Sequence, residues 1–376
     1  MNNIYLDNNA TTEPLSEVVE TVRLALTNNW KNPSSPYLSA QDARMILQST
    51  REAIGSFIQT DPEYIHFVSS GSEANQLSAS SAIALAPKGK NRIVVSAIEH
   101  ASILHWVENL SDKWEVTVIP PNSKGQTSFN DLSKAITEDV ALVIMQWVNN
   151  ETGVIQPVEE ISGIATAMGA FFLVDAAQAI GKIPVLANDI DYLTFTGHKI
   201  HAPKGTGVVV TPHRSTPLFS THEDGWLSGT EPVCLIAGLR EAVQQRSQSF
   251  EEAVDVMRSI RDEFENLLLK AGMMVNGDTD RRVCNTSNIR FPSVDARALM
   301  TRLDLNGLQC SQSSACMSAR PEPSHVLTAM GLSEEEAYAS LRFSFSVLNT
   351  LEDARAGADL VIREYTAIKS FNLEVA

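Results

Sequence analysis

The sequence predicts an α/β protein in which a large domain with a mostly parallel, seven-stranded sheet is joined to a smaller α+β domain. Three observations lead to this fold class. Between residues 60 and 210, short runs rich in Val, Ile and aromatic residues alternate with amphipathic stretches. The runs lack a polar face, as expected for strands that are covered by helices on both sides. After about residue 215, the alternation gives way to long helical segments and short strands.

The elements of the large domain are expected in regular order along the chain. Strands are expected at 65–68, 92–96, 115–119, 141–148, 171–174, 192–196 and 207–210. Helices are expected between them at 73–86, 102–110, 130–136 and 157–168. In such sheets, ligands gather at the carboxyl ends of the strands, so functional side chains are expected there.

The second part of the chain is expected to form the smaller domain. One long helix is predicted over 241–269, ending near Gly272, with further helices at 296–303 and 352–369 and strands at 287–291 and 340–345. The first 15 residues carry a polar motif and little helical pattern, so we expect them to pack near this domain or over the site. The predicted division is therefore residues 16–250 for the large domain, and residues 1–15 with 251–376 for the small one.

Composition narrows the class of protein. The 376 residues are 43% hydrophobic, which is enough for a large core. The 29 basic and 45 acidic residues give a net charge of −16, which argues against broad attraction to nucleic acid or to anionic membrane. The start of the chain lacks the basic and apolar blocks of a signal peptide. The four cysteines form no CxxC pair, so no metal site is expected. We expect a soluble, cytoplasmic enzyme with free thiols and without direct nucleic-acid or membrane partners.

Two charged residues follow apolar strands and point to one cofactor. Lys199 comes after Thr196-Gly-His, where burial can lower the pKa of its ammonium group and make it a nucleophile toward an aldehyde. Asp175 ends the run Phe172-Leu-Val, and a buried acid needs a cationic partner, such as the pyridine nitrogen of pyridoxal 5'-phosphate (PLP). The alternatives are a solvated loop lysine and an aspartate that caps a helix.

Two further strand ends carry polar residues that suit the same cofactor. Gly71 and Ser72 lie where a strand gives way to a helix, so their amides and the serine hydroxyl suit a phosphate, although ordinary helix capping uses the same residues. His100 follows another strand and could stack on a flat ring, although a lone histidine is more often structural. Together these signals converge on PLP.

The ordered series of motifs resembles the cysteine desulfurases, PLP enzymes of the class V aminotransferase group. The resemblance runs from Tyr5 to about Asn349. Its motifs are Tyr5-Leu-Asp-Asn-Asn-Ala10-Thr11-Thr12, Asn32-Pro-Ser-Ser35, Ser69-Ser-Gly-Ser-Glu73, Glu99-His100, Val148-Asn-Asn150-Glu-Thr-Gly153, Val174-Asp-Ala-Ala-Gln178, Thr196-Gly-His-Lys199, Ser228-Gly-Thr230, Ser313-Ser-Ala-Cys316 and Leu341-Arg-Phe-Ser344.

This resemblance implies a PLP enzyme of fold type I and gives the motif residues roles. Lys199 would hold PLP covalently, Asp175 would pair with its pyridine nitrogen and His100 would stack on its ring. Arg342 would clamp the carboxylate of the substrate, because a guanidinium can bind it with two hydrogen bonds. The other implied contacts are Asn150 and Gln178 at the ring oxygen, Gly71, Ser72, Thr196 and His198 at the phosphate, Thr230 at the phosphate of the second subunit, and Ala10, Thr11 and Asn150 at the substrate.

Cys316 decides the reaction that the resemblance implies. Residues 311–323 are rich in Ser, Ala and Pro, which is typical of a loop, and a thiolate there could attack the sulfur of bound L-cysteine. The expected products are L-alanine and a persulfide on Cys316. Cys310 follows an apolar pattern and is expected to be buried. A selenocysteine lyase or a class V aminotransferase of the same fold is the alternative, and a non-catalytic sulfur-relay subunit is a third.

The implied partners are a second copy of the chain and a sulfur-acceptor protein that docks near the Cys316 loop. The acceptor pathway stays open among iron–sulfur assembly, tRNA thiolation and DNA phosphorothioation. Two positions depart from the family pattern. Tyr37 stands where the family has a histidine, and Leu227, in the altered stretch 219–227, stands where it has an arginine. Both bear on acceptor choice and turnover rather than on the cofactor.

Overall fold

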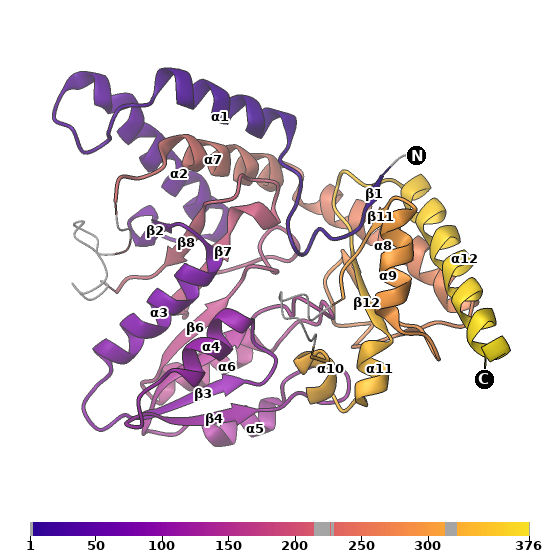
Figure 1. Cartoon of the computed structure of the whole chain (residues 1–376). Coiled ribbons are helices and arrows are strands. Elements are labelled where there is room, and N and C mark those ends of the chain that lie inside the picture. The colour runs from indigo at the N-terminus through magenta and orange to yellow at the C-terminus, as the bar shows by residue number, and fades with distance from the viewer. Residues whose placement is uncertain (1–2, 214–225, 227–228, 313–321, 376) are drawn as a thin grey trace.

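The structure, a computed structural model, describes residues 3–213, 226, 229–312 and 322–375. Two lobes make up the molecule (Figure 1). The larger lobe is built on a seven-stranded sheet, and the smaller lobe contains most of the chain after residue 250. The N-terminal segment crosses from the smaller lobe, at β1 (Ile4–Tyr5), to the larger lobe, at α1 (Ser16–Asn28).

The seven-stranded sheet has the order β2-β8-β7-β6-β5-β3-β4. β8 is antiparallel to its neighbours β2 and β7, and the other strand pairs are parallel. The prediction of a mostly parallel, seven-stranded sheet is therefore confirmed. The strands are β2 (Ile65–Val68), β3 (Arg92–Ser96), β4 (Glu115–Ile119), β5 (Val140–Gln146), β6 (Phe171–Asp175), β7 (Tyr192–Thr196) and β8 (Gly207–Val210).

Helices cover both faces of this sheet. Successive side chains of a strand point to opposite faces, so in β6 Phe172 and Val174 join one core and Leu173 joins the other. The first core is closed by α2 (Gln41–Ile58), α5 (Phe129–Ala135), α6 (Val158–Ala167) and α7 (Val233–Gln248), and the second by α3 (Gly71–Leu85) and α4 (Ala101–Glu108). α1 packs against α7 at the top of the larger lobe (Figure 1). No prediction was made for the segment that forms α1 and α2.

The smaller lobe has a separate apolar core. Its antiparallel sheet has the order β12-β10-β9, formed by β12 (Ser340–Ser344), β10 (Thr286–Arg290) and β9 (Met274–Val275). α8 (Phe250–Lys270) and α12 (Leu351–Val375) lie side by side, with α9 (Ala296–Leu305) next to α12. β1 pairs in parallel with β11 (Leu308–Gln309), and Leu6 enters the same core. The short helices α10 (His325–Ala329) and α11 (Glu334–Tyr338) complete the lobe. None of the described helices is both long and apolar enough to span a membrane.

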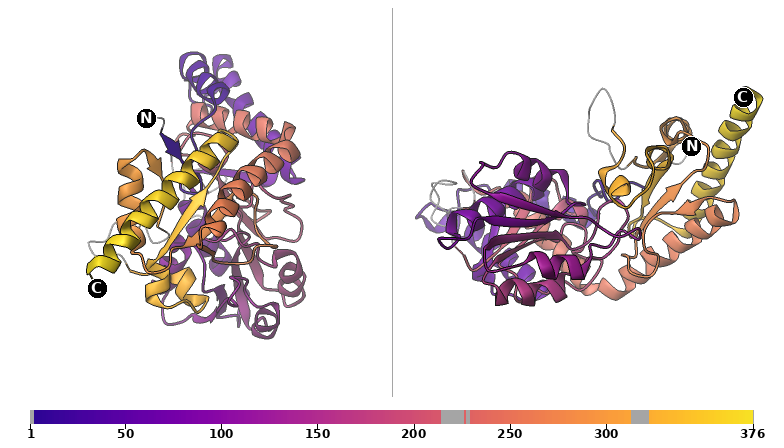
Figure 2. Two further views of the ribbon diagram at one scale, coloured as in Figure 1. Left: turned by 90° about the vertical axis from the view of Figure 1, so that its right-hand side faces the viewer. Right: turned by 90° about the horizontal axis from the view of Figure 1, so that it is seen from below.

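The prediction of one helix over 241–269 is wrong, because the segment is divided between two helices and the first of them begins earlier, at Val233. Two helices, α7 and α8, meet at Ser249, whose φ of −112° and ψ of 20° lie outside the helical region. The Ser249 hydroxyl donates to the carbonyl of Gln245 at 2.8 Å, the local competition with the backbone that serine often makes. At the other end the prediction holds, because α8 stops at Lys270 and Gly272 has a φ of +89°. Figure 2 shows α8 running out along the smaller lobe. The domain boundary at residue 250 stays a prediction.

Candidate active site

The candidate residues of the large sheet lie just beyond the carboxyl ends of its parallel strands. β6 ends at Asp175, and β7 ends at Thr196 and continues into the 3-10 helix η3 (Gly197–Lys199). β2 leads into α3 at Gly71, and β3 leads through Glu99 to His100. Because these strands run in the same direction, their ends meet at one edge of the sheet.

Asp175 is a buried carboxylate that has only neutral hydrogen-bond donors. Its Oδ2 accepts from the Asn75 side chain at 2.7 Å and its Oδ1 accepts from the Ala177 amide at 2.8 Å. No ion pair of the described residues includes it. The alternative that Asp175 caps a helix is wrong, because a series of turns follows it. A buried carboxylate in this setting favours a cationic partner that approaches from the open side.

Lys199 lies at the end of η3 with its ammonium group held by the N-terminal segment. Its Nζ donates to the carbonyls of Asn9 at 2.6 Å and Ala10 at 2.7 Å. Burial and the charge of Arg342 lower the pKa of Lys199 to about 8, against the opposing effect of Asp7 and Asp175. A useful fraction of this amine is therefore neutral near neutral pH, as a nucleophile or a base requires.

His100 combines a structural contact with an exposed side chain. It is the N-cap of α4, where its Nδ1 accepts from the Ser102 amide at 3.2 Å and lies 2.9 Å from the Ser102 hydroxyl. Desolvation lowers the pKa of His100 although Asp175 opposes this effect, and the side chain remains accessible. A neutral ring that accepts at Nδ1 carries its proton on Nε2. The structural alternative and the stacking role are thus compatible.

The start of α3 offers backbone donors next to Thr196. The first amides of a helix, here those of Gly71 and Ser72, have no acceptor within the helix, and they attract anions. A Cβ on Gly71 would lie 3.3 Å from the Thr196 side chain, so glycine permits this close approach. The Thr196 hydroxyl donates to the carbonyl of Thr206 at 2.8 Å. It is therefore engaged rather than free to donate to a phosphate.

His198 faces the N-terminal segment. Its Nδ1 lies 3.2 Å from the Thr11 hydroxyl, and its carbonyl accepts from both the amide and the hydroxyl of Thr12. Burial and the neighbouring Lys199 lower the pKa of His198 to about 4. At neutral pH the ring would act on a phosphate as a neutral hydrogen-bond donor rather than as a cation.

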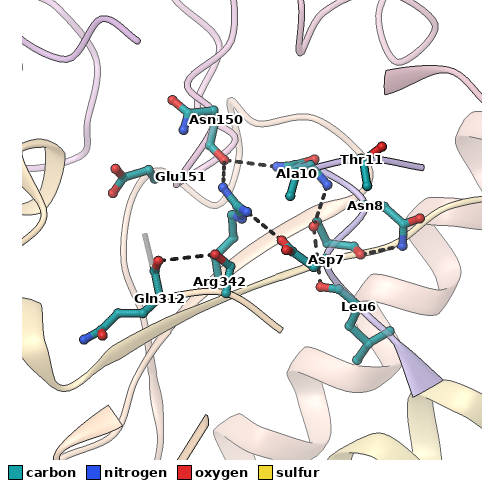
Figure 3. Close-up of polar contacts among 12 residues, drawn as sticks. Leu6, Asp7, Asn8, Ala10, Thr11, Asn150, Glu151, Gln312 and Arg342 are labelled. Carbon is teal, nitrogen blue, oxygen red and sulfur yellow. Dashed lines mark hydrogen bonds and ion pairs between the residues drawn. The ribbon is translucent and has the colours of Figure 1, made fainter. Parts of the chain in front are cut away.

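Arg342, on β12, reaches the site from the smaller lobe (Figure 3). Its Nη2 forms an ion pair with Asp7 at 2.6 Å, and its Nη1 donates to the carbonyl of Asn150 at 3.1 Å. Its Nε is buried without a hydrogen-bond partner. The side chain of Asn150 points away from Arg342, and Ala10 and Thr11 lie near Asp7 (Figure 3). The guanidinium is thus fixed by two contacts, while the hydrogen of its buried Nε has no acceptor among the described residues.

Sequence reasoning missed Asn9, which connects the two lobes. Its carbonyl accepts from Lys199 and from Gln178 Nε2 at 2.9 Å. Its side chain accepts from Lys182 at 3.3 Å and from Asn285 at 3.1 Å, and donates to Thr286 at 2.9 Å. The polar motif at residues 7–12 contained this signal, but nothing in the motif distinguished Asn9 from its neighbours.

Gln178 is held on both sides by residues of this network. Its Oε1 accepts from Lys182 Nζ at 2.6 Å, while its Nε2 donates to the carbonyl of Asn9. Lys182 was also missed, although it follows Gln178 by four positions. Its burial lowers its pKa to about 7. One proton of the Gln178 amide is left for another acceptor.

One described candidate, Thr230, stands apart from this cluster. Thr230 is exposed and lines a hollow of about 320 Å³ with Leu26 and Trp30 near the end of α1. Cys310 is half-buried against the core of the smaller lobe, and desolvation raises the pKa of its thiol, so it is a poor nucleophile. Cys316 and Leu227 lie outside the described residues.

The donor set fits a flat, phosphorylated heteroaromatic cofactor. Asp175 suits a protonated ring nitrogen, Lys199 suits a carbonyl carbon, and His100 offers a flat ring face. The free amides of Gly71 and Ser72 suit a phosphate. Asp175 has no cationic contact among the described residues, and Lys199 is bound only to backbone carbonyls. Both groups can therefore engage such a cofactor.

Comparison with known proteins places this arrangement in a family. The family model described as aminotransferase class-V matches residues 4–356. A curated relative from Nostoc sp., named cysteine desulfurase, is 38% identical over 353 residues, covering 92% of this chain and 88% of the relative.

Solved structures with the same architecture include two whose descriptions bear on function. One described as a NifS-like protein has a TM-score of 0.89 at 28% identity, covering 96% of this chain and 98% of the other. Another, described as SspA in complex with cysteine, has a TM-score of 0.81 at 30% identity, covering 91% of this chain and 98% of the other.

Proposed function

The chain belongs to the class V aminotransferase family, with curated relatives that are cysteine desulfurases, and from this premise we propose that it is itself a PLP-dependent L-cysteine desulfurase. The products would be L-alanine and a persulfide on Cys316. The observation that carries the proposal is the meeting of Lys199, Asp175 and Arg342 around one site, together with a cysteine at position 316. A neighbour solved with cysteine bound supports the choice of substrate.

The proposed cofactor site uses residues from four strand ends. Lys199 would hold PLP, Asp175 would pair with the ring nitrogen, and His100 would lie on the ring face. The amides of Gly71 and Ser72, with His198, would bind the phosphate, while Thr196 would pack beneath Gly71. Gln178 has one amide proton left for the ring oxygen, and Asn150 would lie on the same side. When bound, PLP supplies an electron sink for reactions at the α-carbon of an amino acid.

The remaining chemistry belongs to side chains of the protein. The Nη groups of Arg342 would bind the substrate carboxylate in exchange for the contact with Asp7. Ala10 and Thr11 would line the same side of the substrate. The low pKa of Lys199 allows its Nζ to take a proton from the substrate and to return one.

Sulfur transfer would take place at Cys316. Its thiolate would attack the substrate sulfur, so that an S–S bond forms while the carbon–sulfur bond breaks. The electron pair of the broken bond stays with the three-carbon fragment, which gains a proton and leaves as L-alanine. The persulfide would then pass to an acceptor protein near the Cys316 loop. Iron–sulfur assembly, tRNA thiolation and DNA phosphorothioation are the candidate destinations.

A homodimer in the cytoplasm is part of this proposal. Trp30, which is 71% exposed, lines the hollow that contains Thr230, and Leu38, eight residues later in the chain, is 85% exposed. Large apolar side chains exposed together are typical of protein interfaces. A second copy seated on this surface would bring Thr230 of one subunit toward the other subunit, as the resemblance implies. The free thiols suit a reducing compartment.

The test uses the cysteines at 316 and 310 as a matched pair. Cys316→Ser replaces a soft nucleophile by a hydroxyl that is scarcely ionised at neutral pH, so release of alanine and sulfide should fall by at least ~100-fold. Cys310→Ser makes the same exchange at a half-buried thiol with a raised pKa and should keep activity. Wild-type turnover by Cys316→Ser would favour the alternatives, a selenocysteine lyase or an aminotransferase.

A further inference from the structure

A small cavity lies inside the protein next to Lys199. Its volume is about 10 Å³, close to that of one water-sized sphere. It is lined by Thr12, Lys182, Lys199, His201, Arg246 and Asn285, among others. Apart from Lys199, no candidate residue of the active site that the structure describes lines it, and it is far too small for an amino acid. The cavity therefore adjoins the proposed cofactor site at Lys199 but includes none of the other described residues proposed for it.

Two basic side chains border this cavity in the interior of the protein, Arg246 and Lys182, and burial lowers the pKa of Lys182 to about 7. The exposed fractions of Lys182 and Arg246 are 5% and 6%. Lys182 Nζ donates to Gln178 and Asn9, which uses two of its three protons. The Nη1 atom of Arg246 is buried without a hydrogen-bond partner. The side chain of Arg246 is packed against Gly181, where a Cβ would lie 3.0 Å from its Cγ, so Gly181 gives the arginine its space.

The described residues around the cavity supply no negative charge. The lining contains neither Asp nor Glu. His201 donates from Nδ1 to the carbonyl of Glu13, and burial lowers its pKa to about 4, so the ring is neutral. Cys284 is the one acidic group that acts on both cations, but burial raises the pKa of its thiol, which stays protonated. Charges buried without a partner cost several kcal/mol each.

We propose that this cavity binds one small monovalent inorganic anion of the chloride class between Lys182 and Arg246. Such an ion accepts hydrogen bonds from the free proton of Lys182 and from Nη1 of Arg246, and it neutralises charge that no described side chain balances. A monatomic halide is only somewhat larger than a water molecule and needs a small shift of the lining, whereas sulfate, phosphate and carboxylates are much larger. Through Lys182, the ion also secures Gln178 and Asn9, and Asn9 holds Lys199.

The first test measures thermal unfolding of the full-length protein as isolated, at constant ionic strength. Replacing sodium gluconate by sodium chloride or bromide should raise the Tm by a few degrees and then saturate, since a ligand that binds only the folded state stabilises it. Sulfate should give no saturable rise at low concentration. An excluded-salt effect would instead favour sulfate and would not saturate. Equal Tm values in gluconate and halide would overturn the proposal.

The second test locates the ion. Crystals grown in bromide should show an anomalous peak between Lys182 Nζ and Arg246 Nη1. Density there without an anomalous signal would mean that water fills the cavity, and it would overturn the proposal. In Arg246→Met the Tm should no longer depend on halide. In Arg355→Ala, which changes an exposed arginine on α12, this dependence should remain. Should Arg246→Met fail to fold, Lys182→Met gives the same comparison, and the bromide experiment needs no variant.

Discussion

The guanidinium of Arg342 shows at the scale of one residue how the site is prepared for a substrate. It is fixed by Asp7 and by the carbonyl of Asn150, yet its Nε remains buried and unpaired. Arg342→Ala should weaken L-cysteine binding by ~10- to 100-fold, since a hydrogen bond to a charged group contributes about 1.5–3 kcal/mol. Arg342→Lys should restore binding only in part, because an ammonium cannot form the paired bonds.

Two readouts distinguish weaker binding of L-cysteine from a loss of folding. The visible absorbance of bound PLP should survive in Arg342→Ala, and spectral titration with L-cysteine then gives the affinity. Arg355→Ala is the control, because this arginine is exposed on the far helix α12. Unchanged affinity in both Arg342 variants would mean that another residue binds the carboxylate.

Glu99 is a buried acid beside the site. In the sequence it stands out only as part of the motif Glu99-His100. Its Oε1 accepts from the Gln146 amide at 2.8 Å and its Oε2 has no partner. Burial raises its pKa to about 8, although the Gln146 amide opposes this and Asp175 adds to it. The carboxyl group is therefore protonated at neutral pH.

The raised pKa of Glu99 makes stability depend on pH with a definite sign. The folded protein holds a proton on Glu99 that the unfolded chain releases near pH 4.5. The contribution of Glu99 to the free energy of unfolding is therefore complete below pH 4.5 and is lost as pH rises through about 8. Glu99→Gln cannot lose a proton. The free energy of unfolding of the wild type, minus that of Glu99→Gln, should fall between pH 5 and 8 by up to ~1.4 kcal/mol per pH unit. Urea unfolding at each pH measures it, with exposed Glu108→Gln as control, and a flat difference would contradict the assignment.

At the scale of elements, the turn after β5 joins the large sheet to β10. Gly153 in this turn has a φ of +77°, and a Cβ there would lie 2.8 Å from Cβ of Thr286. Gly153→Ala should therefore lower the free energy of unfolding by about 1–3 kcal/mol more than Gly89→Ala does. Gly89 has a comparable φ of +98° but open space around it, so it isolates the steric effect. Equal losses in urea unfolding would show that the two lobes can shift to accommodate the methyl group.

The elements were predictable where a local pattern determines them. The strands of the large sheet and the helices between them follow from short apolar runs and amphipathic stretches. The break at Ser249 was not predictable, because both flanking segments are strongly helical and one side-chain bond to Gln245 accompanies the turn. The two-residue strands β1, β9 and β11 exist only through pairing across the fold, and no local pattern marks them.

At the scale of the molecule, the residues at the strand ends could be predicted because the parallel direction of the strands brings them to one edge. The contributions of Asn9, Lys182 and Arg246 could not be predicted, since they depend on how the N-terminal segment and α7 pack against that edge. Charge near the site is therefore set by long-range packing. The sequence motifs identify the chemistry, while the surrounding fold sets the pKa of Lys199 and the contacts of Arg342.

The assembly gives a prediction at the same scale. Glutamate at both Trp30, which lines the hollow with Thr230, and Leu38 would place charges at exposed apolar positions and should shift the protein from dimer to monomer in sedimentation velocity. Activity should fall in parallel if Thr230 serves the partner's site. Leu305→Glu, at a residue 79% exposed on α9, should leave the dimer intact. A wild-type protein that sediments as a fully active monomer would contradict the dimer.

The central claim is that sulfur passes from L-cysteine to the thiol of Cys316. Mass spectrometry of the full-length protein after brief exposure to L-cysteine tests it most directly. The account predicts one added sulfur on the peptide that contains Cys316, removable by a thiol reductant and missing in Cys316→Ser. No added sulfur on that peptide while alanine accumulates, or sulfur found on Cys310 instead, would contradict it.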